Sequence, residues 1–240
     1  MKIISSGKEV LYSVFFPRRC PICDEAVVYG KDICEKCEKE LPYIEEPSCK
    51  KCGKQLSNEQ NEYCSDCNRK VHYYKQGKAV FSYQKGMKSS MYRFKYASRR
   101  EYAAFYARIA AERLGAWVLR HGIEVIVPIP MYKSKQRKRG YNQAEVFAKY
   151  LGICLSIPVD TKLVRRIKNT VPQKELNDIQ RKDNLKGAFH LQTNIVKYRK
   201  ILLVDDIYTT GSTMDAVAKC LLETGIEDVF VLTICIGEGC

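Results

Sequence analysis

The chain has 240 residues, of which 45% are hydrophobic and 10% aromatic, and this composition is typical of an ordered globular protein with one main domain and a smaller one. No apolar run approaches the ~20 residues that a membrane-spanning helix needs, which argues against a protein that crosses the membrane. The net charge of +14 lies almost wholly after residue 75, where 28 Lys and Arg outnumber 15 Asp and Glu; this excess indicates a polyanionic partner, a phosphorylated substrate or a solvated basic surface.

The first element along the chain is an apolar segment, VLYSVFFP, at residues 10–17. It is too short to span a membrane, and it lacks the small-residue cleavage site of a signal peptide. We expect an amphipathic helix that packs on the protein itself, and a surface for a membrane or a partner is the alternative.

Eight of the 12 cysteines form four CxxC pairs within residues 1–75. Two cysteines three residues apart direct both thiolates at one ion, and a second pair completes a closed tetrahedral zinc site that holds the fold rather than catalyses. Disulfides are disfavoured because no secretory signal is evident, and iron–sulfur clusters are a further alternative. We therefore predict a domain of two zinc ribbons, with sequential pairing as the simplest arrangement and interleaved pairing open. The predicted zinc ligands are Cys20, Cys23, Cys34, Cys37, Cys49, Cys52, Cys64 and Cys67.

From residue 76 to residue 240 the pattern changes to alternating strands and helices, which predicts a second domain with a parallel sheet flanked by helices. The predicted strands cover residues 78–84, 124–130, 200–206 and 228–236. The predicted helices cover residues 101–120, 141–151 and 212–224. A polar stretch from 165 to 186 shows no steady periodicity. Trp117 falls on the apolar face of its helix, so we expect it to serve packing.

Two adjacent carboxylates, Asp205 and Asp206, end the strand in ILLVDDIYTTGSTMDA at residues 201–216. Open α/β sheets bind ligands at the carboxyl ends of their strands, which is where these two residues lie. Two like charges this close together cost free energy unless a bound group compensates them. Carboxylates here would accept hydrogen bonds from the vicinal hydroxyls of a ribose. Replacing both by Asn is therefore expected to abolish ligand binding and, by removing the repulsion, to stabilise the empty protein slightly.

The turn after the acids is a candidate phosphate site. A helix N-terminus offers free N–H groups and partial positive charge, a glycine permits close approach of the backbone, and hydroxyls add donors. The candidate substrate-binding residues of this turn are Thr209, Thr210, Gly211, Ser212 and Thr213. An ordinary helix cap would account for Ser212 but not for the acids, so we predict a ribose 5-phosphate pocket.

The run KSKQRKRG at residues 133–140 has five cations in seven residues and is followed by Tyr141. A solvated loop is the usual interpretation of such a run. Beside a phosphate site and near aromatic residues we favour contact with a nucleic-acid backbone, with the tyrosine stacking on a base. The candidate DNA-binding residues are Lys135, Arg137, Lys138, Arg139 and Tyr141.

The segment VDDIYTTGST resembles the phosphoribosyl-pyrophosphate loop of type I phosphoribosyltransferases. Together with the four CxxC pairs, VPIP at 127–130 and RKRGYNQA at 137–144, it makes nearly the whole chain similar to the ComF family of competence proteins. The resemblance implies a double zinc ribbon before a type I phosphoribosyltransferase-like α/β domain. It further implies a cytoplasmic role in handling single-stranded DNA during natural transformation, with a competence helicase at the inner membrane face as a partner.

The same resemblance suggests roles for residues outside the loop. Residues 130–133 fall where these enzymes bind pyrophosphate, so Lys133 would meet the diphosphate of phosphoribosyl pyrophosphate, with Mg²⁺ bridging its oxygens. Arg165, Arg166, Lys168 and Gln173 fall in a mobile loop whose cations stabilise the leaving group. Lys95 either reaches the diphosphate or lies on a solvated face. The catalytic candidates are Asp205, Asp206 and Arg166.

Two functions remain open at this point. The first is a competence protein that handles single-stranded DNA and keeps a site for phosphoribosyl pyrophosphate or another ribose phosphate. The second is an active phosphoribosyltransferase of nucleotide metabolism, with an unknown acceptor and no role with DNA. The sequence shows no feature that reads a purine or pyrimidine acceptor, so it leaves both the acceptor and the occurrence of catalysis open.

Overall fold

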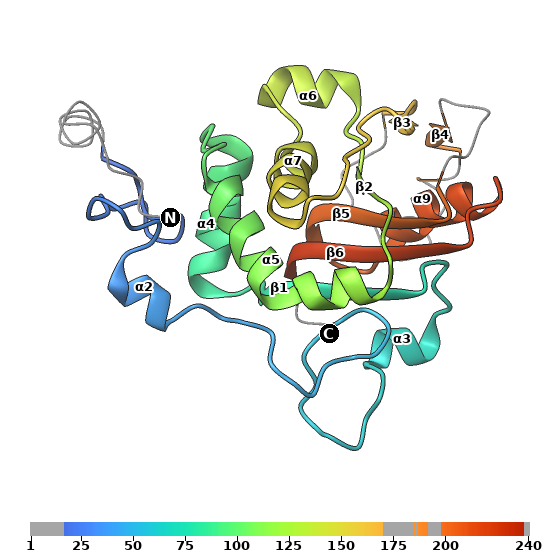
Figure 1. Cartoon of the computed structure of the whole chain (residues 1–240), viewed down its shortest axis with the longest axis horizontal. Coiled ribbons are helices and arrows are strands. Elements are labelled where there is room, and N and C mark those ends of the chain that lie inside the picture. The colour runs from blue at the N-terminus through green and yellow to red at the C-terminus, as the bar shows by residue number, and fades with distance from the viewer. Residues whose placement is uncertain (1–16, 170–184, 186, 192–197, 238–240) are drawn as a thin grey trace.

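The computed structural model describes residues 17–169, 185, 187–191 and 198–237 (Figure 1). The helix expected over residues 10–17 therefore lies almost wholly outside the described residues, as does Gln173. Within the described ranges no helix is both long enough and apolar enough to cross a membrane.

Four parallel strands form the central sheet in the order β1-β6-β5-β2. Their bounds are β1 Gln76–Ser82, β2 Val125–Pro128, β5 Lys200–Tyr208 and β6 Asp228–Ile236. Successive side chains of β5 point to opposite faces, so Leu202 and Val204 enter one core and Ile201 and Leu203 enter the other. A sheet buried on both faces explains the unbroken apolar run before the acids. All four strands were predicted, and β5 continues past the acids to Tyr208.

Helices cover both faces of this sheet (Figure 1). On one face lie α4 Lys85–Tyr96, α5 Tyr102–Arg120 and α7 Gln143–Leu155, and on the other lies α9 Ser212–Leu222. Trp117 of α5 packs edge-on against Phe230 with ring centroids 5.9 Å apart, and its indole Nε1 donates to Gln76 at 2.9 Å. The prediction that this tryptophan serves packing is confirmed.

Three short elements differ from the expectations. The basic run forms a helix, α6 Lys133–Arg139, rather than a loop, because Lys, Arg and Gln favour helix and Gly140 ends it with a left-handed φ of 85°. The polar stretch contributes β3 Val164–Arg166, which pairs antiparallel with β4 Phe189–Leu191. Strands of three residues are too short to show an alternating pattern, which is why they were missed.

Both predicted ribbons form, and each packs on a different face of the sheet. The first, with α2 Glu35–Lys39, joins the core under α4 and α5, where Ser90 donates to the Pro21 carbonyl. The second, with α3 Ser65–Arg69, joins the core beside α9. In the second ribbon the turn at Gly53 lies so close to β1 that a Cβ would sit 2.7 Å from the Lys78 Cα.

Short extended segments cover both edges of the sheet. Beside β1, the Ile44 amide donates to the Val80 carbonyl at 3.0 Å, and the Ser82 amide donates to the Pro42 carbonyl at 2.8 Å. Beside β2, the Ile126 amide donates to the Pro158 carbonyl at 2.9 Å. The first covering segment belongs to the region between the two ribbons.

Candidate functional site

The eight predicted zinc ligands form two clusters of four, and in each the sulfur atoms all lie within 4.8 Å of one another. The first cluster is Cys20, Cys23, Cys34 and Cys37, and the second is Cys49, Cys52, Cys64 and Cys67. A tetrahedral zinc with Zn–S bonds of about 2.3 Å sets its sulfurs about 3.8 Å apart. The Sγ–Sγ distances of 3.8 Å between Cys23 and Cys34 and 3.7 Å between Cys52 and Cys64 fit that geometry. These are structural zinc sites, and the sequential pairing is confirmed.

The turn after β5 requires a glycine. Gly211 has a φ of 73° and caps α9, and a Cβ there would lie 2.8 Å from the Tyr208 Cζ and 3.1 Å from the His72 Cε1. The N-cap residue of α9 is this glycine, which has no side chain that could cap the helix. The backbone approach that a phosphate needs at a helix N-terminus is therefore not blocked by a capping side chain of residue 211.

The two acids have different partners. The Asp206 carboxylate lies 2.9 Å from the Lys95 ammonium, with the two side chains 11% and 19% exposed, and the Asp206 amide donates to Asp205 at 2.8 Å. Burial alone would lower the pKa of Lys95, but attraction to Asp206 outweighs it and raises that pKa. Lys95 thus lies inside the site, not on a solvated face.

Of the two acids, Asp205 is the one whose ionised form is disfavoured by its surroundings. Burial first, and then repulsion from Asp206, raise the pKa of Asp205 to about 7. The positive charges of Lys95 and Arg166 only partly oppose this shift. Near neutral pH this carboxyl therefore exchanges between a neutral and a charged form, and a ligand that donates hydrogen bonds would favour the charged one.

Asp205→Asn is expected to stabilise the empty protein at pH 8, and the gain should vanish near pH 4. The native pKa lies above the unfolded value of about 3.9, so the native state holds the proton between these values and stability falls as pH rises through that window. The gain at pH 8 should be on the order of a few kcal/mol. Denaturant unfolding from pH 4 to 8.5 measures it, with Asp228→Asn at the amino end of β6 as the control. Parallel pH profiles for wild type and Asp205→Asn would contradict this assignment.

Of the predicted cations Arg166 and Lys133, the first acts on the charge of Asp205, and the second lies after a neighbouring strand. Arg166 of β3 lies with its guanidinium 5.4 Å from the Phe189 ring centroid. Burial lowers the pKa of Arg166, and the charge of Asp205 acts against that shift. Lys133 begins α6, just after β2, the strand beside β5, and its side chain is exposed.

A buried amide that the sequence reading missed holds the turn before Lys133. Asn142 donates through Nδ2 to the Ile129 carbonyl at 2.9 Å, and the Ile129 amide donates to the Val204 carbonyl at 2.9 Å. The Asn142 side chain also accepts from the Ala144 amide at the start of α7. One side chain thereby fixes both the candidate pyrophosphate turn and the helix that follows α6.

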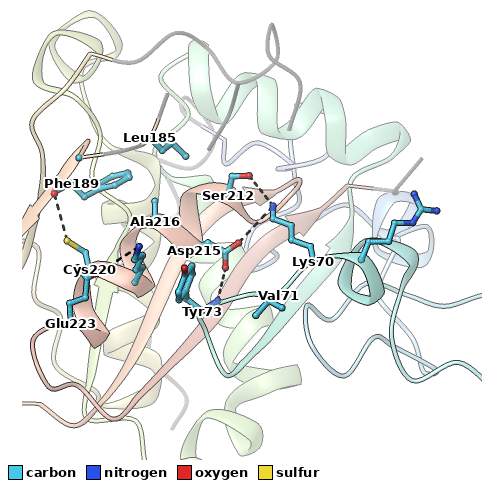
Figure 2. A pocket seen from close by; sticks show the side chains of 13 residues that line it. Lys70, Val71, Tyr73, Leu185, Phe189, Ser212, Asp215, Ala216, Cys220 and Glu223 are labelled. Carbon is cyan, nitrogen blue, oxygen red and sulfur yellow. Dashed lines mark hydrogen bonds and ion pairs between the residues drawn. The ribbon is translucent and has the colours of Figure 1, made fainter. Parts of the chain in front are cut away.

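The segment that follows the second zinc ribbon contacts the candidate phosphate turn and the first turns of α9 (Figure 2). The Lys70 ammonium donates to the Thr210 carbonyl at 2.9 Å and to the Ser212 hydroxyl at 3.3 Å. His72 Nδ1 lies 2.8 Å from an Asp215 carboxylate oxygen, whose partner oxygen accepts from the Tyr73 amide at 3.0 Å. These contacts join segments about 140 residues apart, and no local pattern in the sequence signals them.

A cavity of about 810 Å³ lies between the ribbon, α9 and β4 (Figure 2). Its wall includes Tyr73, Phe189 and Leu185, and from the phosphate turn it includes Ser212. Neither Asp205 nor Asp206 lines it. We place the candidate site at the acids, because the charges and the turn that suit a ribose phosphate are there.

The structure overturns one predicted DNA contact. Tyr141 is 5% exposed, its hydroxyl donates to the Phe94 carbonyl, and the Arg100 guanidinium lies 4.6 Å from its ring centroid. A ring packed in this way cannot stack on a base. The side chains of Arg137 and Lys138 on α6 are exposed, so the basic run keeps cations for a polyanion.

Two domain families match the chain. The double zinc ribbon domain matches residues 11–68, and the phosphoribosyl transferase domain matches residues 107–238. The second match covers more than half of the chain and includes both acids, the turn and α6.

Among known proteins, the chain is 42% identical over 110 residues to Competence protein F of Haemophilus influenzae, which covers 45% of this chain and 48% of that protein. It is 30% identical over 160 residues to DNA utilization protein YhgH of Salmonella typhimurium, covering 65% and 70%. It is 32% identical over 152 residues to Competence protein ComFC of Bacillus subtilis, covering 63% and 60%. The chain thus aligns with between 48% and 70% of the length of these relatives.

Proposed function

The chain belongs to the ComF family of competence and DNA utilization proteins, and from this premise we propose that it handles single-stranded DNA during natural transformation. The names of the relatives point to competence and DNA utilization as the process. The excess of Lys and Arg after residue 75 supports binding to the negatively charged DNA backbone. Such a role would be carried out in the cytoplasm, and association with the inner face of the membrane would bring the protein to a competence helicase as its partner.

We further propose that the site binds phosphoribosyl pyrophosphate or a related ribose phosphate. The observation that carries this is the buried pair of Lys95 and Asp206 beside a second carboxyl and a glycine turn. The acids would accept from the ribose diol, the turn would hold the 5-phosphate, and Lys95 and Arg166 would face the diphosphate. Carboxylate oxygens are also the ligands that Mg²⁺ prefers, and the bound ion would neutralise the diphosphate charge.

Calorimetry tests the ligand. The zinc-loaded protein is titrated with phosphoribosyl pyrophosphate in the presence of Mg²⁺, and ribose 5-phosphate is the second titrant. Binding of either supports the pocket, and tighter binding of the pyrophosphate supports the roles of Lys95 and Arg166. No binding of either at millimolar concentration would contradict the proposal.

Replacing Arg137 and Lys138 by Ala is expected to weaken single-stranded DNA binding equally for all sequences. Each lost phosphate contact should reduce the slope of log K against log salt by about 0.7, so the double variant should lose about 1.4. Fluorescence anisotropy from 50 to 300 mM salt measures it. The matched control replaces Lys36 and Lys39, two exposed cations on α2. An unchanged slope in the α6 variant would make that helix merely a solvated surface.

An active phosphoribosyltransferase is the second candidate, and the intact acid pair with Arg166 nearby favours it. The reaction would displace pyrophosphate at the anomeric carbon, with the cations of the site stabilising the departing charge. Release of pyrophosphate from phosphoribosyl pyrophosphate, measured with free bases and with DNA as acceptors, separates catalysis from binding alone.

A further inference from the structure

Helix α4 presents two tyrosines to solvent. Tyr92 and Tyr96 are 64% and 59% exposed, although aromatic side chains of this size usually find a partner in the fold. They are four residues apart, which puts them on one face of the helix. Their ring centroids lie 5.1 Å apart with the planes inclined at 48°. The two rings form one continuous apolar surface, which we call the tyrosine face.

Cations flank the tyrosine face at both ends. The Arg139 guanidinium of α6 lies 4.8 Å from the Tyr96 ring centroid and donates to its hydroxyl at 3.3 Å. Arg139 is itself held in place by Gln143, whose side-chain oxygen accepts at 2.8 Å. At the other end Lys88 precedes Tyr92 by one turn and is exposed. A ligand on these rings would therefore meet positive charge on either side.

The tyrosine face adjoins the candidate ribose-phosphate site. Lys95 leaves the same turn of α4 and reaches Asp206 at 2.9 Å. Arg139 lies near enough to Lys95 for its positive charge to lower the pKa of that lysine, although the net shift is upward. A chain lying across Tyr92 and Tyr96 would thus run beside the helix turn from which Lys95 reaches the candidate site.

We propose that Tyr92 and Tyr96 are the platform on which bases of single-stranded DNA stack, with Arg139 and Lys88 on the flanking phosphates. The inference rests on the proposed DNA function and names the surface that performs it, in place of the buried Tyr141. Aromatic side chains set among cations suit a single strand, because its bases offer free faces and its backbone is negative. Duplex DNA suits the surface less well, because its bases are stacked on one another. An acidic protein also suits it less well, because it would bind the cations and leave the rings without a role.

The test compares two oligonucleotides of equal length, oligo-dT and an abasic strand with the same phosphates. Tyr92→Ala/Tyr96→Ala should weaken oligo-dT binding by about thirty-fold or more, and should leave abasic binding and the salt slope unchanged. Tyr92→Phe/Tyr96→Phe keeps both rings and should retain most of the affinity. Tyr29→Ala removes a tyrosine of the first ribbon that is 52% exposed, and should have no effect.

The outcomes separate this inference from the function on which it rests. If wild type binds no oligonucleotide, the DNA function fails, and the tyrosine face fails with it. If wild type binds oligo-dT and the double Ala variant binds it equally well, only the platform is overturned, and the rings are then free to serve a protein partner. An equal loss on both strands would also overturn it, because the effect would not depend on bases.

Discussion

Replacing Asp205 and Asp206 together by Asn is expected to abolish the stabilisation of the protein by phosphoribosyl pyrophosphate and Mg²⁺. Asn keeps the size of the side chain but loses the charge that strengthens a hydrogen bond from a hydroxyl and attracts the metal. At a ligand concentration of 100 times Kd, wild type should gain about 2.7 kcal/mol, or roughly 5–10 °C in melting temperature. Paired thermal melts with and without ligand measure the difference.

The structure changes one part of the sequence-based expectation for this variant. Two repelling acids suggested that the empty double variant would be slightly more stable than wild type. Asp206, however, is the counter-charge of the buried Lys95, and removing one partner of a buried pair costs about 3–5 kcal/mol. Replacing Asp205 relieves the repulsion only where that carboxyl is charged, and its pKa is about 7. At pH 6 the loss of the Lys95 counter-charge therefore dominates, and the double variant should melt lower than wild type without ligand.

A matched variant separates this loss of stability from the loss of binding. Lys95→Met/Asp206→Asn removes both charges of the pair, and its empty form should recover most of the stability that Asp206→Asn loses. It should still give no response to the ligand. If the variant lacking both acids melts higher with ligand, as wild type does, the acids serve structure only and the ribose site is misplaced.

Removal of both zinc ions is expected to unfold the region of the two ribbons. Apparent binding energies of structural zinc reach about 10–16 kcal/mol, and a ribbon of this size has little other core. The purified protein should contain two zinc ions per chain, one for each four-cysteine cluster. Metal analysis, followed by limited proteolysis with and without a chelator, measures both quantities. A metal-free protein that resists cleavage in this region would contradict the prediction.

The two ribbons should differ in their effect on the site. Cys49→Ser/Cys52→Ser should abolish the ligand response, because Lys70 and His72 then lose their positions under the phosphate turn. Loss of the first zinc should act on α4 instead, through the contacts of Pro21 and its neighbours. Cys154→Ser, on the exposed side of α7, is the control and should change neither property.

The sequence was sufficient to predict those features that depend on residues close together in the chain. The CxxC pairs specified both metal sites, since a chelating pair needs only neighbouring residues and tight turns. Apolar runs located all four strands of the sheet, because strands buried on both faces leave that pattern. The acids and the glycine turn could be located for the same reason, since both follow directly from one strand.

What the sequence could not show depends on contacts between distant segments. Lys70 meets Thr210 only through the packing of the second ribbon. Lys95 pairs with Asp206 only because the last turn of α4 lies near the carboxyl end of β5. Tyr141 follows a basic run and reads as exposed, yet its ring is buried next to Phe94. Exposure of an aromatic ring is a tertiary property, so sequence could not distinguish Tyr141 from Tyr96.

The covered edges of the sheet have a consequence for solubility. The cover on β1 comes from residues around Pro42 and Ile44, which lie between the two ribbons. Unfolding of the ribbons would release this cover and expose a row of unpaired amide and carbonyl groups along a buried, apolar strand. Such an edge recruits other chains, so protein that has lost its metal would aggregate rather than persist as an inactive monomer. Zinc supply would then set how much of the protein stays in solution.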